Sequence, residues 1–100
     1  MIYRLEIRPA ATRDVFEAAQ WYDQKQSGIG HEFSAHILAA IESMAQTPLV
    51  HAIRNKRKKV RWFIPSRFPY KIYYRVEGEV VVVLAVIHSA RHDREWMKRS

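Results

Sequence analysis

Alternating apolar and polar residues predict extended strands on both sides of a long central region, because neighbouring side chains of a strand point to opposite faces. Residues 2–7 alternate in this way, with Arg4 and Glu6 at the polar positions. Segments 57–63 and 68–76 repeat the pattern. We therefore expect three half-buried strands, one before and two after the central region.

A further strand is predicted by the unbroken apolar run Val80–Ile87. Its β-branched residues favour extended backbone, and the absence of polar positions is typical of a central strand covered on both faces. Glu77-Gly78 comes just before this run and predicts a tight turn from the preceding strand. The last two strands should therefore pair as a hairpin.

The central region predicts two helices, because its apolar residues recur every three or four positions. The first helix is expected to begin at Pro9, which suits a first helical turn, and to end before Gly28. The second is expected to end at Thr47-Pro48, since a residue before proline avoids the helical conformation. The short link 26–30 predicts an antiparallel helical hairpin. The apolar faces consist of Ala11, Val15, Ala18, Ala19 and Tyr22 in the first helix and Phe33, Ile37, Ile41 and Met44 in the second.

The predicted order is therefore βααβββ, which favours an α+β domain. We expect a two-helix hairpin packed on one face of a small, mostly antiparallel sheet. With 100 residues, of which 48% are hydrophobic, the chain can bury one core but not two. Residues 1–100 should form a single domain.

The same alternation predicts that the sheet face opposite the helices is basic and open. If Val60, Ile72 and Tyr74 face the helices, the intervening side chains project the other way. Tyr73 would then lie among cations, where it could stack on a nucleic-acid base or form a cross-strand aromatic pair. The outward set is Arg57, Lys59, Arg61, Lys71, Tyr73 and Arg75.

Charge changes the picture because it is unevenly distributed. The formal net charge is +7, and residues 54–100 hold 13 of the 17 basic residues but only 4 of the 10 acidic ones. No acid occurs between Arg54 and Arg75. Such polarity favours binding of a nucleic acid or an acidic protein. The alternative is a solvated basic face that only aids solubility.

Several classes of protein are not favoured. The chain has no cysteine for a disulfide or a thiolate site, and its N-terminal residues do not resemble a signal peptide. The longest apolar run is too short to cross a bilayer, so we expect a cytoplasmic protein without a membrane partner. His88 and His92 have a spacing that suits a metal pair on a helix, but no third ligand accompanies them. We expect neither a metal nor a cofactor.

Two residues near the end of the last strand suggest chemistry. RNA cleavage needs a base for the 2′-hydroxyl, an acid for the leaving oxygen and cations for the phosphate. His88 could transfer a proton, and Arg91 could bind the phosphate with both arms of its guanidinium. The alternative is structural: His88 ends a strand, and Arg91 pairs with Asp93 or Glu95.

An ordered set of motifs covers nearly the whole chain. The motifs are Ala18-Ala19-Gln20-Trp21-Tyr22, Gly28-x-Gly30-x-x-Phe33, Pro48, Arg67-Phe68-Pro69-Tyr70-x-Ile72-x-Tyr74 and Ala85-Val86-x-His88-x-x-Arg91-x-x-x-x-Trp96. Together they resemble the RelE/ParE superfamily of bacterial toxins.

This resemblance implies a growth-inhibiting toxin of a type II toxin–antitoxin module, of the kind linked to plasmid stabilisation, that a cognate antitoxin neutralises. RelE-like members cut mRNA on the ribosome, whereas ParE-like members inhibit DNA gyrase. The Phe-Pro-Tyr and Ala-Val-x-His-x-x-Arg motifs resemble the ParE-like branch more closely than the RelE-like branch. We therefore favour gyrase as the target. The alternatives are a metal-independent mRNA interferase and a nucleic-acid-binding domain without toxicity.

The resemblance also implies site residues. Lys71 and Arg91 fall at or next to positions where RelE-like enzymes place arginines, and Arg61 lies in the strand that supplies further cations. At the position of a RelE-like tyrosine this chain has Trp96, which cannot transfer a proton. If the protein is an enzyme, the candidate catalytic residues are Arg61, Lys71, His88 and Arg91. The candidate nucleic-acid-binding or target-binding residues are Lys56, Arg57, Lys59, Arg67, Tyr73 and Arg75.

Overall fold

The computed structural model describes residues 3–91 and 94–99. Strand β1 (Arg4–Ile7) leads into helices α1 (Pro9–Lys25) and α2 (Ile29–Gln46). Strands β2 (Ile53–Asn55), β3 (Val60–Phe63), β4 (Tyr70–Glu77) and β5 (Val80–His88) follow, and a short helix α3 (Arg94–Met97) comes last. The predicted α+β order is confirmed, with two additions that the pattern did not indicate: β2 and α3.

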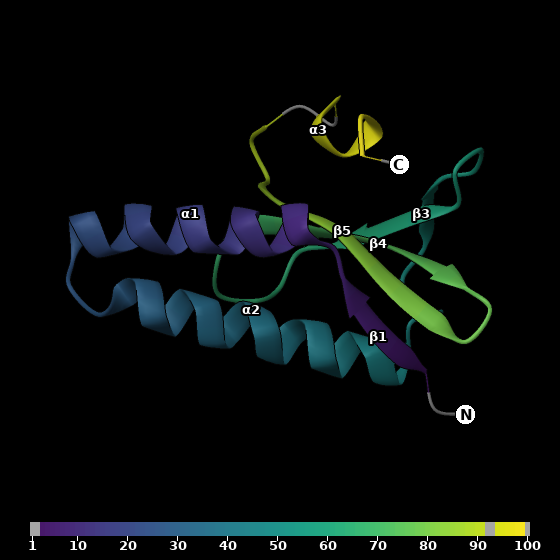
Figure 1. Cartoon of the computed structure of the whole chain (residues 1–100), viewed down its shortest axis with the longest axis horizontal. Helices are drawn as coiled ribbons and strands as arrows, with labels where there is room; N and C mark the ends of the chain where they lie inside the picture. The colour runs from purple at the N-terminus through teal and green to yellow at the C-terminus, as the bar shows by residue number, and fades with distance from the viewer. Residues whose placement is uncertain (1–2, 92–93, 100) are drawn as a thin grey trace.

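The five strands form one sheet in the order β1-β5-β4-β3-β2. β1 runs parallel to β5, while the other neighbouring pairs are antiparallel. α1 and α2 lie together against one face of the sheet, and α3 lies on the other side (Figure 1). The predicted helical hairpin on a small, mostly antiparallel sheet is therefore confirmed.

The turn between α1 and α2 is fixed by one carboxylate. Asp23 Oδ1 accepts hydrogen bonds from the backbone amides of Gly28 (3.1 Å) and Gly30 (2.8 Å). Gly28 has φ of 94°, a left-handed conformation that glycine adopts without steric cost. A Cβ atom on Gly30 would lie 2.2 Å from the Ala19 carbonyl oxygen, so glycine there lets the two helices approach closely.

The main core lies between the helical hairpin and the sheet. Phe33, Ile37 and Ile41 of α2 are at most 2% exposed and pack against Ile72 and Tyr74 of β4. The predicted inward face of the second helix is thus confirmed. Burial of each such side chain contributes about 1.5–3 kcal/mol, so this layer stabilises the fold strongly.

The sequence suggested that the opposite face of the sheet is open, but this face is covered. It holds a second cluster of buried side chains, among them Val60, Tyr73, Leu84 and Ile87. Trp96 of α3 covers this cluster, is 2% exposed, and stacks on the Tyr73 ring with 5.6 Å between ring centroids. Of the two interpretations of Tyr73, base stacking on an exposed ring is wrong, because α3 buries that ring completely. The alternative, a cross-strand aromatic pair, is confirmed: Tyr73 is paired with Trp62, with 6.2 Å between the ring centroids.

The orientation of β3 also differs from the expectation. Val60 belongs to the α3-side cluster, whereas Arg61 pairs with Tyr74 and shares its helix-side face. The expected alternation had the opposite phase. The expected phase assumed that buried apolar side chains face the helices, whereas the α3-side cluster also buries apolar side chains, Val60 among them.

A β-bulge interrupts the β4–β5 pairing. Tyr73 pairs with Ala85 and Tyr74 with Val83, so Leu84 has no partner in the register. The extra residue places Leu84 and Ala85 together in the α3-side cluster. The bulge lies where β5 passes the end of β1, next to the strand edge on which the candidate site is built.

Candidate functional site

The end of β5 borders a pocket, which we call the edge pocket. β1 ends at Ile7, opposite Val83, so the rest of β5 has no neighbouring strand on that side. α1 and residues 94–99, which we call the C-terminal segment, lie beside this unpaired strand edge. Between them is a cavity of about 490 Å³. The residues that matter chemically are Asp14, Trp21, Tyr70, His88, Arg91 and Arg99.

His88 and Arg91 both line the edge pocket, so the structure brings these two candidate catalytic residues together. His88 is half-buried at the end of β5, and Arg91 is exposed. His88 Nδ1 accepts a hydrogen bond from the Ala90 amide at 3.0 Å. An imidazole that accepts at Nδ1 carries its hydrogen on Nε2, so the Nε2–H group of His88 is arranged to donate a hydrogen bond.

Tyr70 is the third chemically capable group in the edge pocket. It pairs with His88 across the β4–β5 ladder, and the two rings lie 5.2 Å apart. Burial and the neighbouring Tyr22 raise the pKa of Tyr70, while the Arg91 guanidinium acts in the opposite direction. The alternation of the strand did not predict this contact between Tyr70 and His88.

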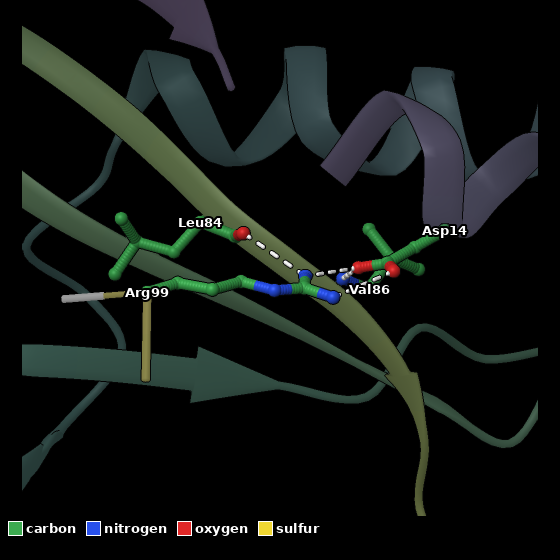
Figure 2. A network of polar contacts seen from close by, with 4 residues as sticks. All are labelled: Asp14, Leu84, Val86 and Arg99. Atoms are coloured by element: carbon green, nitrogen blue, oxygen red, sulfur yellow. Dashed lines mark hydrogen bonds and ion pairs between the residues drawn. The ribbon is translucent and has the colours of Figure 1, made fainter. Parts of the chain in front are cut away.

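Asp14 and Arg99, which also line the edge pocket, form an ion pair beside β5 (Figure 2). Arg99 Nη1 and Nη2 donate to Asp14 Oδ2 (2.5 Å) and Oδ1 (3.0 Å). Asp14 Oδ2 also accepts from the Val86 amide at 2.9 Å, and Arg99 Nη1 lies 3.4 Å from the Leu84 carbonyl oxygen. The pair therefore provides hydrogen-bond partners for the Val86 amide and the Leu84 carbonyl, which a further strand would otherwise supply. No motif pointed to Asp14 or Arg99, since they lie far apart in sequence.

Arg61 is not part of the edge pocket. Its guanidinium donates to the carbonyl oxygens of His51 (2.5 Å) and Leu49 (3.4 Å). These groups lie toward the opposite edge of the sheet, where β3 and β2 are. His51 stacks on Phe63 with 4.4 Å between ring centroids. Burial lowers the pKa of His51, and the nearby cations Arg54 and Arg61 lower it further. Arg61 therefore has a structural role in holding the segment after α2.

Lys71 lies apart from the edge pocket as well. Its Nζ is 4.4 Å from the centroid of the Trp62 ring, and the Arg54 guanidinium is 4.5 Å from the same ring. Trp62 sits on β3 between the strands that carry these two cations. The four candidate catalytic residues thus occupy three separate places, and only His88 and Arg91 share one.

The candidate binding residues also divide. Arg67 forms an ion pair with Glu32, and Arg75 forms one with Glu77, each at 2.6 Å. Tyr73 is buried. By contrast, the cations of the β2–β3 turn are solvent-exposed and form no ion pair with any residue that the structure describes. These exposed residues are Lys56, Arg57 and Lys59.

Comparison with protein families decides the class of the protein. A family model described as "ParE toxin of type II toxin-antitoxin system, parDE" matches residues 5–93. This chain belongs to the ParE toxin family. The sequence-based identification of a type II toxin of the RelE/ParE superfamily is confirmed, and a nucleic-acid-binding domain without toxicity is not favoured.

Solved structures show the same fold as this ParE-family toxin. A chain of the chromosomal ParDE TA system from P. aeruginosa aligns with a TM-score of 0.78 and 18% identity, covering 87% of this chain and 96% of the other. The E. coli toxin RelE, a mutant in the free state, gives 0.68 and 15%, covering 99% and 94%. The toxin–antitoxin complex RelBE2 from Mycobacterium tuberculosis gives 0.58 and 21%, covering 88% and 99%. A search of curated proteins finds no significant match.

Over residues 3–91 and 94–99, no group of three or more histidine, cysteine or acidic side chains is arranged to hold a metal ion. Within the same residues, no helix is long and apolar enough to span a membrane.

Proposed function

We propose that this toxin inhibits DNA gyrase and that a cognate antitoxin neutralises it. Membership of the ParE family supports the proposal, because ParE-like members of the superfamily are gyrase inhibitors. The observation that carries it is the separation of the candidate catalytic groups. A ribonuclease needs its base, acid and phosphate-binding cations around one reacting phosphate.

The position expected for a RelE-like tyrosine gives a second argument. Trp96 is buried against Tyr73, and its indole nitrogen has no hydrogen-bond partner among the described residues. An indole cannot act as a general acid or base, and a buried one cannot contact a substrate. The C-terminal segment therefore supports inhibition by binding in preference to RelE-like cleavage.

A protein partner is supported by exposed apolar side chains. Phe16 and Trp21 of α1 are 61% and 51% exposed, and Leu38 of α2 is 48% exposed. Large aromatic groups on the surface are typical of protein interfaces, where their burial supplies much of the binding energy. The ParDE system and the RelBE2 complex named above each contain an antitoxin, and we expect an antitoxin to cover this helical hairpin.

Induced expression tests the target directly. We expect gyrase-dependent DNA breaks and loss of supercoiling activity, with cellular mRNA intact. Co-expression of the antitoxin should restore growth, and a gyrase variant that resists the toxin should do so without it. Cleavage of mRNA in cells whose chromosomes remain intact would overturn the proposed target.

A specific observation keeps mRNA cleavage as the second candidate function. Tyr70, His88 and Arg91 share the edge pocket and supply two proton-transfer groups and one cation. This set differs from the predicted one, since Tyr70 replaces Arg61 and Lys71. It requires that RNA enter between α1 and the C-terminal segment. Ribosome-dependent cleavage of mRNA in the expression experiment would support this candidate.

A further inference from the structure

The turn between β2 and β3 concentrates positive charge without any local compensation. Its residues 56–59 read Lys-Arg-Lys-Lys, and Arg54 and Arg61 flank them. We call residues 53–63 the basic hairpin. The four turn residues have no carboxylate partner in the described part of the chain. Adjacent like charges repel one another, so this turn is at its most stable when a polyanion lies against it.

The turn is ordered, which makes the cations a defined surface. The Lys58 amide donates to Asn55 Oδ1 at 2.9 Å, closing the turn. Lys59 has φ of 57°, a left-handed conformation in which asparagine or glycine would be less strained. A lysine at this position therefore costs backbone energy while adding charge. In Figure 1 the turn is the loop that extends outward beyond β3.

The aromatic residues beside the basic hairpin argue against a single-stranded ligand. Proteins that bind single strands stack bases on open aromatic faces. Tyr73 is fully buried, and Trp62 is contacted by Arg54 from β2 and by Lys71 from β4. A base could therefore stack on the half-buried Trp62 only by competing with these two cations for its ring. The remaining means of recognition is contact between cations and a phosphate backbone.

We propose that the basic hairpin binds the phosphate backbone of double-stranded DNA. A two-stranded ribbon fits the major groove, and a projecting turn with four cations reaches the phosphates on either side. This binding is a property of the toxin alone, additional to inhibition of gyrase. In a cell it would hold the toxin on the DNA where its target works.

The test measures binding of the purified toxin to a short duplex of mixed sequence as salt is raised from about 50 to 200 mM. The hairpin variant is Lys56→Gln/Arg57→Gln/Lys59→Asn. We expect its affinity to fall at least tenfold and the slope of log K against log salt to decrease in size by about 2.7, that is about 0.9 for each phosphate that the variant no longer neutralises. A charge-conserving variant, Lys56→Arg/Arg57→Lys/Lys59→Arg, should bind like the parent.

The matched control removes the same charge from elsewhere. Arg4→Gln/Arg13→Gln/Lys25→Gln changes exposed residues of β1 and α1, and it should lose less than threefold in affinity. Equal losses in the two triple variants would overturn the proposal, as would tighter binding to single strands than to duplex. Loss of antitoxin binding by a hairpin variant that still binds DNA would assign the hairpin to a protein partner and also overturn it. Because gyrase is absent from the assay, hairpin-dependent DNA binding would stand even if the toxin proved to have another target.

Discussion

Arg99 binds Asp14 across almost the full length of the chain, with two guanidinium nitrogens on two carboxylate oxygens. The side chains are 24% and 13% exposed, so solvent screens the pair only in part. Asp14 also accepts the Val86 amide, which ties α1, the β5 edge and the C-terminal segment to a single carboxylate. The pair therefore replaces the strand that β5 lacks beyond the end of β1.

Loss of either partner should destabilise the fold. We expect Arg99→Ala to lower the free energy of unfolding by about 1–2 kcal/mol and Asp14→Ala by about 2–3 kcal/mol, because the aspartate variant also leaves the Val86 amide unsatisfied. Urea unfolding measures both. Arg13→Ala, on the exposed neighbour of Asp14, should change stability by less than about 0.5 kcal/mol. Equal losses of stability in Asp14→Ala and Arg99→Ala would show that the hydrogen bond from the Val86 amide to Asp14 does not contribute to stability.

Trp96 should act through its volume and not through its indole nitrogen. We expect Trp96→Ala to cost about 3–5 kcal/mol, because it opens a cavity over Tyr73. Trp96→Phe should cost about 1–2 kcal/mol, since the indole nitrogen makes no hydrogen bond to the described residues. Thermal unfolding compares the two variants. A phenylalanine variant as unstable as the alanine variant would mean that the nitrogen has a partner in solution.

Stability should fall in strongly alkaline solution because of Tyr74. Burial raises the pKa of Tyr74 to about 12 from 10.0, and its hydroxyl donates to the Pro48 carbonyl oxygen at 2.5 Å. Between these two values the unfolded chain loses the phenolic proton while the folded chain keeps it, so unfolding becomes easier as pH rises. Tyr74→Phe should flatten this fall and cost about 1 kcal/mol at neutral pH. Denaturant unfolding from pH 9 to pH 12 would check the slope.

His51 should make the protein sensitive to mild acid. Its pKa is lowered from 6.5 by burial and then by Arg54 and Arg61, so the unfolded chain takes up a proton before the folded chain does. Stability is then lost as pH falls through 6.5. His51→Gln should reduce this loss, whereas His31→Gln, on an exposed residue, should leave it unchanged. Unfolding at pH 5 and pH 8 compares them, and an unaltered acid response in His51→Gln would contradict the assignment.

The edge pocket separates the two functional hypotheses. If the toxin cleaves mRNA, Arg91→Ala should lower cleavage by about 10²-fold and His88→Ala by a comparable factor, with antitoxin binding retained. Tyr70→Phe keeps the ring and removes the hydroxyl, so it should also lose cleavage. If the toxin inhibits gyrase without catalysis, Tyr70→Phe should remain toxic. Growth assays with paired measurements of mRNA cleavage distinguish these results, and toxicity retained in all three variants would exclude the nuclease hypothesis.

The long elements could be predicted from the sequence because their apolar spacing is regular and Pro9, Gly28 and Pro48 mark their ends. β2 was not predicted, since three residues do not establish an alternation. The phase of β3 was predicted wrongly because a second buried cluster takes up Val60 on the α3 side, which leaves Arg61 and Phe63 facing the helices. Alternation gives two faces of a strand; it does not tell which face a third layer will cover.

The site was harder to predict for a different reason. His88 and Arg91 were found because they lie close together in the sequence and are chemically capable. Tyr70, Asp14 and Arg99 join them only through strand pairing, the bulge at Leu84 and the return of the C-terminal segment. Tyr73 was placed on the correct face of β4 and still misjudged as open, because the alternation of a strand does not show which of its faces Trp96 covers.

The parallel pairing of β1 with β5 has a consequence for biosynthesis. Arg4 aligns with Val80, so the first strand has no neighbour in the sheet until the fifth has left the ribosome. The helical hairpin and the β4–β5 hairpin are local and can form earlier, whereas the sheet closes only afterwards. A growing chain therefore carries an exposed first strand throughout most of its synthesis. The order of the strands therefore delays completion of the folded toxin until its fifth strand has emerged.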